Sequence, residues 1–129
     1  MSTTAETASP TSTSSLAAST TFRTFAVVFA IATPVLYVIC EMRNWPLFTY
    51  HPGTGRVDLF WAPMVRDQGP AMQWYGWTAN TLIGSGILGL LATMLPENLT
   101  KRIPLSLVWL LPLVAVPILI YGLRFYWRW

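Results

Sequence analysis

The sequence predicts an all-α integral membrane protein with three transmembrane helices and a short interfacial β-hairpin between the first two. Of its 129 residues, 53% are hydrophobic and only 10% are charged, whereas soluble domains usually carry about 25% charged residues. The apolar residues form three charge-free stretches, and aromatic residues gather near their ends. This distribution predicts helices at about 24–44, 71–95 and 103–125, with the hairpin in a loop at 45–70.

The N-terminal segment 1–21 is expected to be a disordered Ser/Thr-rich tail that precedes a three-helix membrane domain at 22–129. Ser and Thr occupy most positions of this segment, which therefore cannot bury an apolar face. No Lys or Arg precedes Arg23, which argues against a transit peptide and against the basic start of a secretory signal. The apolar stretch that follows is expected to be an uncleaved membrane anchor.

The first predicted span carries no charge from 24 to 40, between Arg23 and Glu41. A helix of this length covers roughly 25 Å, slightly less than the hydrocarbon core of a bilayer. Pro34 lies in its middle and is expected to kink the helix and to free the carbonyl of Ala30. In lipid such a carbonyl requires a neighbouring helix.

A β-hairpin is predicted in the loop between the first two spans. Two short β-prone segments, 47–50 and 56–61, flank a Gly-rich segment at 51–55. This pattern is typical of two antiparallel strands joined by a short turn. The hairpin carries several aromatic side chains, and we expect it to lie at the membrane interface.

The second predicted span lies in a charge-free run and has small or weakly polar residues on one face. Small residues let helices approach closely in lipid, where a hydrophobic drive between helices is absent. The stripe therefore predicts a packing hub, which joins either the protein's own helices or a partner subunit. It consists of Gly76, Asn80, Thr81, Gly84, Ser85, Gly89 and Thr93.

The third predicted span begins with Pro104 and contains Pro112 and Pro117, which are expected to bend it. It ends in alternating aromatic and basic residues, a pattern typical of an interfacial anchor rather than of a nucleic-acid site. We expect no nucleic-acid partner. The tryptophans expected to anchor the protein at the interfaces are Trp45, Trp61, Trp74, Trp77, Trp127 and Trp129.

Orientation follows from the basic residues outside the spans. The bare count of Lys and Arg favours a hairpin on the cytoplasmic side. However, Arg23 directly precedes the first span, and Lys101 and Arg102 are densely placed in the short second connection. We therefore predict that the N-terminus lies inside and that the hairpin faces outward.

Few residues are suited to catalysis. One Cys and one His exclude a four-ligand Cys/His zinc site, an internal disulfide and a CxxC redox pair. No charged residue falls clearly inside any of the three spans, since the few charges near them lie at their ends, and this disfavours a proton or ion pathway. Ion pairs are expected to order the loop, and the alternative is a catalytic carboxylate pair of Glu41 with Asp58 or Asp67. We predict no enzyme activity and no catalytic residue.

Soft metal ligands gather around the loop. Thiolate, thioether and imidazole groups favour Cu(I), but Met is also ordinary apolar filling and the spacings do not repeat. We therefore predict no metal site, with His51 as a hydrogen-bonding residue of the turn and a pigment or haem ligand as its alternative role. The soft-ligand candidates are Cys40, Met42, His51, Met64 and Met72.

The segments FTYHP at 48–52 and GPAMQWYGW at 69–77 are similar to small uncharacterised bacterial integral membrane proteins. The resemblance covers the loop and the start of the second helix, and carries no function with it. It supports the predicted membrane topology and nothing more. The localisation that we expect is the bacterial inner (cytoplasmic) membrane.

These observations favour a non-catalytic accessory or assembly subunit of a larger membrane complex, such as an energy-transducing one, in contact with the lipid bilayer and other subunits. Abundant aromatics, small-residue faces and freed carbonyls favour contact with neighbours, while catalytic groups are nearly absent. The alternative is a binding module for an apolar cofactor, pigment or lipid, held near Tyr37, Asn80 and the hairpin. A copper-handling membrane protein or an enzyme is the third hypothesis.

Overall fold

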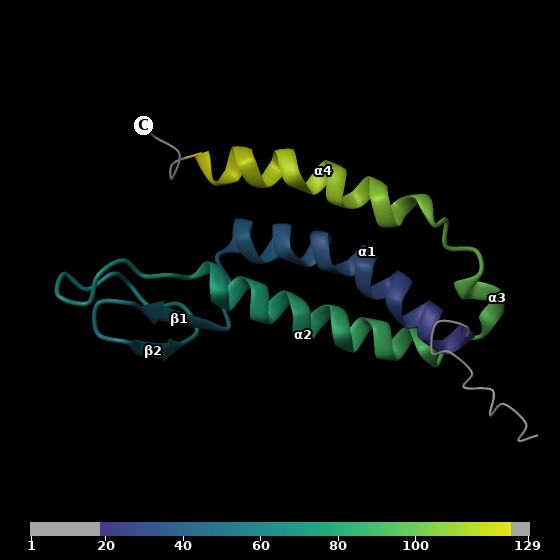
Figure 1. Ribbon diagram of the computed structural model, residues 1–129, viewed down its shortest axis with the longest axis horizontal. Helices are drawn as coiled ribbons and strands as arrows, with labels where there is room; N and C mark the ends of the chain where they lie inside the picture. The colour runs from purple at the N-terminus through teal and green to yellow at the C-terminus, as the bar shows by residue number, and fades with distance from the viewer. Residues whose placement is uncertain (1–18, 125–129) are drawn as a thin grey trace, which may run out of the picture.

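The computed structural model describes residues 19–124, which are mostly helical and include a small antiparallel sheet. Helix α1 lies beside both α2 and α4, with the hairpin at one end of the helices and α3 at the other (Figure 1). Most of the predicted tail, together with Trp127 and Trp129, lies outside the described residues. The elements in order are α1 (Thr20–Arg43), β1 (Phe48–His51), β2 (Arg56–Leu59), α2 (Trp74–Thr93), α3 (Glu97–Thr100) and α4 (Ser106–Gly122).

Helix α1 begins at Thr20, a few residues before its predicted start, and contains Pro34. It ends at Arg43 and is capped by Asn44, whose φ of 51° lies in the left-handed region. Asn tolerates this conformation better than most residues do, and a left-handed residue commonly terminates a helix. The next amide, that of Trp45, donates to the carbonyl of Cys40 at 2.9 Å. This cap turns the chain sharply from α1 toward the hairpin.

Helix α1 is long and apolar enough to cross a membrane, with 24 residues and mean hydropathy of 2.1. Most of its side chains are at least partly exposed, unlike those of a helix buried in the core of a soluble protein. N-terminal signal sequences share this length and hydropathy. Among the helices in residues 19–124, α1 alone is both long enough and apolar enough to be a candidate membrane span. Helix α4 is apolar but has only 17 residues.

The predicted hairpin is confirmed, with a shorter second strand. Strands β1 and β2 pair in antiparallel register, with Thr49 opposite Asp58 and His51 opposite Arg56. The prediction that His51 lies in the turn was wrong, because its backbone continues the strand and the turn begins at Pro52. The alternation of side chains along β1 places Thr49 and His51 on the same, buried face.

Helix α2 begins at Trp74, three residues later than predicted. The reason is a second partner for β1, since the chain before α2 runs antiparallel to this strand. The amide of Met72 donates to the carbonyl of Tyr50 at 2.8 Å, and the amide of Tyr50 donates to the carbonyl of Met72 at 3.1 Å. Strand β1 is therefore hydrogen-bonded on both sides, by β2 on one and by the segment at Met72 on the other.

One face of α2 packs against α1 and the hairpin. A Cβ atom at Gly89 would lie 2.8 Å from Cδ2 of Phe25, and one at Gly84 would lie 3.0 Å from Cδ1 of Leu36. Small residues here allow α1 and α2 to approach closely. The buried residues of α2 are Gly76, Trp77, Thr81, Ser85, Gly89 and Ala92.

The short connection after α2 contains the one-turn helix α3. Helix α4 then starts at Ser106, shortly after Pro104, and contains Pro112 and Pro117. Ala115 is its one buried residue. Helix α4 therefore packs against α1 through a narrow face and leaves most of its apolar side chains exposed.

Gly76 provides a test of the contact between α2 and the hairpin. A Cβ at this position would overlap the carbonyl oxygen of Phe48 and lie 2.7 Å from Cβ of Pro46. We expect Gly76→Ala to lower the free energy of unfolding by about 3 kcal/mol, because the obstacle is backbone and cannot rotate away. Thermal unfolding of the full chain in mild detergent measures this.

The matched control is Gly86→Ala in the same helix, where nothing lies within 4 Å of the added Cβ. Helix propensity should make this variant up to about 1 kcal/mol more stable. Equal effects of the two substitutions would contradict the close approach at Gly76.

Candidate functional site at the hairpin

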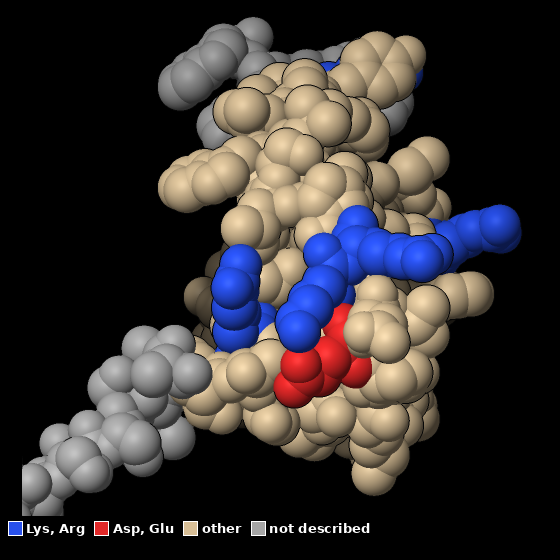
Figure 2. Space-filling view, turned by 90° about the vertical axis from the view of Figure 1, so that its right-hand side faces the viewer, with Lys and Arg blue, Asp and Glu red and all other residues tan. Residues whose placement is uncertain are grey.

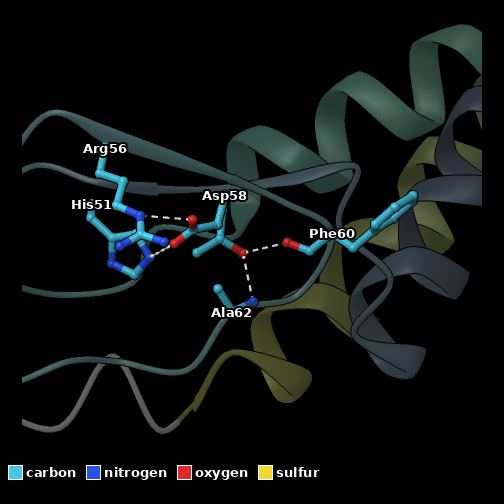
Figure 3. Close-up of polar contacts among 6 residues, drawn as sticks. His51, Arg56, Asp58, Phe60 and Ala62 are labelled. Atoms are coloured by element: carbon cyan, nitrogen blue, oxygen red, sulfur yellow. Dashed lines mark hydrogen bonds and ion pairs between the residues drawn. The ribbon is translucent and has the colours of Figure 1, made fainter.

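Thr49, on β1, binds the segment that follows β2 through hydrogen bonds of its side chain. Its side chain is fully buried. Its hydroxyl donates to the carbonyl of Phe60 at 2.8 Å and accepts from the amide of Ala62 at 3.1 Å (Figure 3). Both backbone groups belong to a stretch without regular secondary structure, so a side chain supplies the partners that a sheet would otherwise provide.

His51 and Asp58 form a second cross-strand contact beside Thr49. The imidazole is 0% exposed. Its Nε2 lies 3.2 Å from Oδ2 of Asp58, whose other carboxylate oxygen accepts from Nε of Arg56 at 2.8 Å (Figure 3). Neither ring nitrogen of His51 has a hydrogen-bond partner among the described residues, so the approach of Nε2 to Asp58 is a close contact and Arg56 is the one donor to this carboxylate. The contact places His51 and Asp58 side by side across the two strands.

The burial of His51 bears on its chemistry. A general base must reach the proton that it removes, and a fully buried ring is closed to a substrate. The single cysteine of the sequence, Cys40, is also buried, and its Sγ lies 3.7 Å from Nδ2 of Asn80. The geometry therefore assigns His51 to the structure of the hairpin.

Phe60, directly after β2, has a strained backbone. Its φ is 63°, a left-handed value that is unusual for a bulky residue and costs free energy. The conformation is held from both sides, because its amide donates to the carbonyl of Leu47 at 2.9 Å and its carbonyl accepts from Thr49. The phenyl ring is nevertheless 66% exposed. The fold thus fixes a strained backbone and directs a large apolar side chain outward.

Phe60 belongs to an exposed set of apolar side chains that we call the hairpin apolar surface. Exposed apolar patches on an ordered element are typical of contact sites for proteins or membranes. This surface combines aromatic rings with aliphatic and thioether groups, the composition favoured at the centres of protein interfaces. It comprises Trp45, Val57, Leu59, Phe60, Trp61 and Met64.

A hollow of about 390 Å³ adjoins this surface where the hairpin meets the helices. Nδ2 of Asn80, from α2, donates to the carbonyl of Trp45 at 3.1 Å and so links α2 to the end of α1. We call this feature the hairpin hollow. Its lining residues are Asn44, Trp45, Pro46, Leu47, Phe60, Trp61 and Asn80.

The residues proposed for copper or a cofactor have different surroundings. Met42 and Met64 are exposed, whereas Cys40 and His51 are buried beside different partners. Tyr37 is partly buried and does not line the hairpin hollow. Residues 19–124 contain no group of three or more His, Cys, Asp or Glu side chains that could hold a metal ion.

The predicted interface anchors also differ in their surroundings. Trp45, Trp61 and Trp74 are exposed, whereas Trp77 is only 5% exposed and its Nε1 has no hydrogen-bond partner among the described residues. Of the predicted packing stripe, Thr93 is partly buried.

The roles of Thr49 and Phe60 were not predicted from the sequence. The buried position of Thr49 could have been inferred from its alternation with His51 along the predicted strand. The left-handed backbone of Phe60 could not, because no sequence pattern indicates it.

Comparison with known proteins gives no family, because no family of known sequences, no curated protein and no solved structure matches this chain.

Thr49→Val tests the contribution of the two Thr49 hydrogen bonds to stability. The substitution keeps the shape of the side chain but removes the hydroxyl, which leaves the carbonyl of Phe60 and the amide of Ala62 without their partner. We expect a loss of about 2 kcal/mol in the free energy of unfolding, because buried polar groups are costly when unpaired. Denaturant titration of the full chain in detergent measures it.

Thr78→Val is the matched control. Thr78 is exposed on α2, and its hydroxyl donates to a carbonyl of its own helix at 2.8 Å. Its loss should change stability by less than about 0.5 kcal/mol. Similar losses at both positions would show that Thr49 does not have the role described.

Proposed function

We propose that the protein crosses the membrane three times, through α1, α2 and α4, and serves as a non-catalytic accessory or assembly subunit of a larger membrane complex. The membrane part of the proposal is supported by the exposed apolar surfaces of α2 and α4, which flank the span-length helix α1. In water such surfaces would favour aggregation. Examples are Leu82, Ile83, Ile87 and Leu90 on α2, and Trp109, Leu113, Val116 and Ile120 on α4.

The orientation proposed is with the N-terminus inside a bacterial cytoplasmic membrane. Figure 2 views the α3 end of the molecule and shows basic side chains gathered beside acidic surface. Arg23, Lys101 and Arg102 are the exposed basic residues near this end, where short connections carry positive charge. Basic residues in short connections favour the cytoplasmic side, so the hairpin would face outward.

The observation that carries the subunit role is the strained, outward-facing Phe60. A strained backbone is kept only when its surroundings over-determine it, and such residues cluster at functional sites. Here two hydrogen bonds hold the strained backbone, one from the amide of Phe60 to the carbonyl of Leu47 and one from the hydroxyl of Thr49 to the carbonyl of Phe60, and Phe60 stays exposed beside the hairpin hollow. A rigid aromatic side chain next to a hollow resembles the anchors that dominate protein interfaces. The proposed docking site is therefore the hairpin apolar surface.

Phe60→Gly separates docking from folding. Glycine adopts a positive φ freely, so the free energy of unfolding should stay unchanged or rise by about 1 kcal/mol. Retention of the partner should fall about tenfold or more, as for loss of an aromatic anchor. The measurement is quantitative affinity purification of tagged chain from its native membrane, with photo-crosslinking from position 60 to identify the contact.

Leu82→Ala is the control, since Leu82 is an exposed apolar residue on α2, away from the hairpin apolar surface. It should leave partner retention unchanged, and a crosslinker at position 82 should capture lipid. Purification of the wild-type chain from its native membrane as a lone monomer would contradict the proposal.

The hairpin hollow favours one alternative, a binding module for an apolar cofactor, pigment or lipid. Its lining is largely aromatic and aliphatic, and Asn80 contributes a polar group at its edge. Ligand sites commonly combine an apolar lining with few polar groups. This alternative predicts an absorption band or an extractable lipid in the purified chain, and its loss after Trp61→Ala. Purified chain without either would contradict it.

A further inference from the structure

A second hollow lies at the other end of the helices, where α1 begins and α3 leads into α4. It measures about 340 Å³ and combines basic, hydroxyl and aliphatic side chains. We call it the basic hollow. It is lined by Thr20, Arg23, Thr24, Val27, Thr100, Lys101, Ile103 and Leu105.

The positive charge of the basic hollow is only partly balanced. Arg23 forms no ion pair with any residue in 19–124, whereas Lys101 has one, from Nζ to Oε2 of Glu97 at 3.0 Å. Both members of that pair are largely exposed, so the pair contributes little to stability. The hydroxyls of Thr20 and Thr24 have no hydrogen-bond partner in the described part of the chain. Donors and net positive charge therefore converge on an unfilled space, which suits an anion.

An apolar groove adjoins the basic hollow and shares Thr100 and Ile103 with it. The groove measures about 370 Å³. On α1 its lining begins at Val28, one residue beyond the last α1 residue of the basic hollow, and on α2 it extends back to Leu88. It therefore runs from the end of the helices toward their middle. Its remaining lining residues are Leu91, Ala92, Leu95 and Leu99.

We propose that the basic hollow and the apolar groove together bind one anionic phospholipid. The phosphate would lie on Arg23 and Lys101, with the threonine hydroxyls as further donors, and an acyl chain would follow the groove. The order of the two features along the helices, charge at the end and apolar lining further in, matches the order of headgroup and chain in a bilayer. Basic pockets between membrane helices recognise such headgroups.

This inference rests on the membrane insertion in the proposed function, but it needs no partner protein. A soluble anion would use only the basic hollow and would leave the apolar groove empty. A zwitterionic lipid would bring a cation close to Arg23 and would gain less from the charge. The two features together therefore commit the site to a phospholipid with net negative charge.

Native mass spectrometry of the full chain in detergent tests the site. Phosphatidylglycerol and phosphatidylcholine with the same acyl chains are the probes, supplied in equal amounts. We expect the wild type to retain phosphatidylglycerol preferentially. Each basic residue near anionic lipid contributes roughly fivefold to binding, so the double variant Arg23→Gln with Lys101→Gln should lose about 25-fold.

The matched control removes the same charge elsewhere. Arg43 and Arg66 are exposed basic residues that form no ion pair with any residue in 19–124. The double variant Arg43→Gln with Arg66→Gln should keep the lipid preference. Leu95→Trp, at the exposed edge of the groove, should weaken binding of long-chain lipid while its thermal unfolding stays as in the wild type.

Several outcomes would overturn the inference. Equal retention of the two lipids, equal losses in the two double variants, or displacement of phosphatidylglycerol by inorganic phosphate would each do so, the last by showing a simple anion site. Alkaline extraction of native membranes separates this failure from that of the proposed function. Release of the chain would remove both proposals, whereas retention without a lipid preference would overturn the lipid site alone.

Discussion

The close approach of α2 to the backbone of β1 at Gly76 positions everything at the hairpin end of the molecule. The amide of Leu47 donates to the carbonyl of Gly76 at 3.0 Å, and the space where a Cβ would stand is filled by Phe48 and Pro46. A two-stranded hairpin alone is marginally stable in water. Contact with a helix and pairing with the segment at Met72 give this hairpin the support that it lacks by itself.

The polar and the apolar side chains of the hairpin have different roles. Thr49 and His51 are buried and hold the strands and the following segment together. The backbone of Phe60 is held by hydrogen bonds to Leu47 and from Thr49, and Phe60 itself remains exposed. The polar groups of the hairpin therefore serve its structure, and its apolar groups form the surface proposed for docking.

The two ends of the helices differ in chemistry, which is why the two proposals concern different ligands. At the hairpin end the hairpin apolar surface adjoins a hollow with a largely apolar and aromatic lining. At the α3 end Arg23 has no ion-pair partner among residues 19–124, and it faces a hollow that continues into an apolar groove. We therefore propose a partner protein at the hairpin end and an anionic lipid at the α3 end.

The sequence by itself determined the helical class, the hairpin and the approximate position of each helix, because charge, hydrophobicity and glycine placement act locally along the chain. It misplaced the start of α2 and the position of His51, since the first depends on the pairing of Tyr50 with Met72 and the second on the pairing of His51 with Arg56. The sequence identified several residues of the candidate sites, such as Trp45, Trp61 and Asn80, but the tertiary structure alone decided which residues meet. The left-handed backbone of Phe60, the burial of Trp77 and the basic hollow between α1 and α3 all arise where segments distant in sequence meet. No local pattern encodes such a meeting, because the free energy that holds it comes from contacts between those segments.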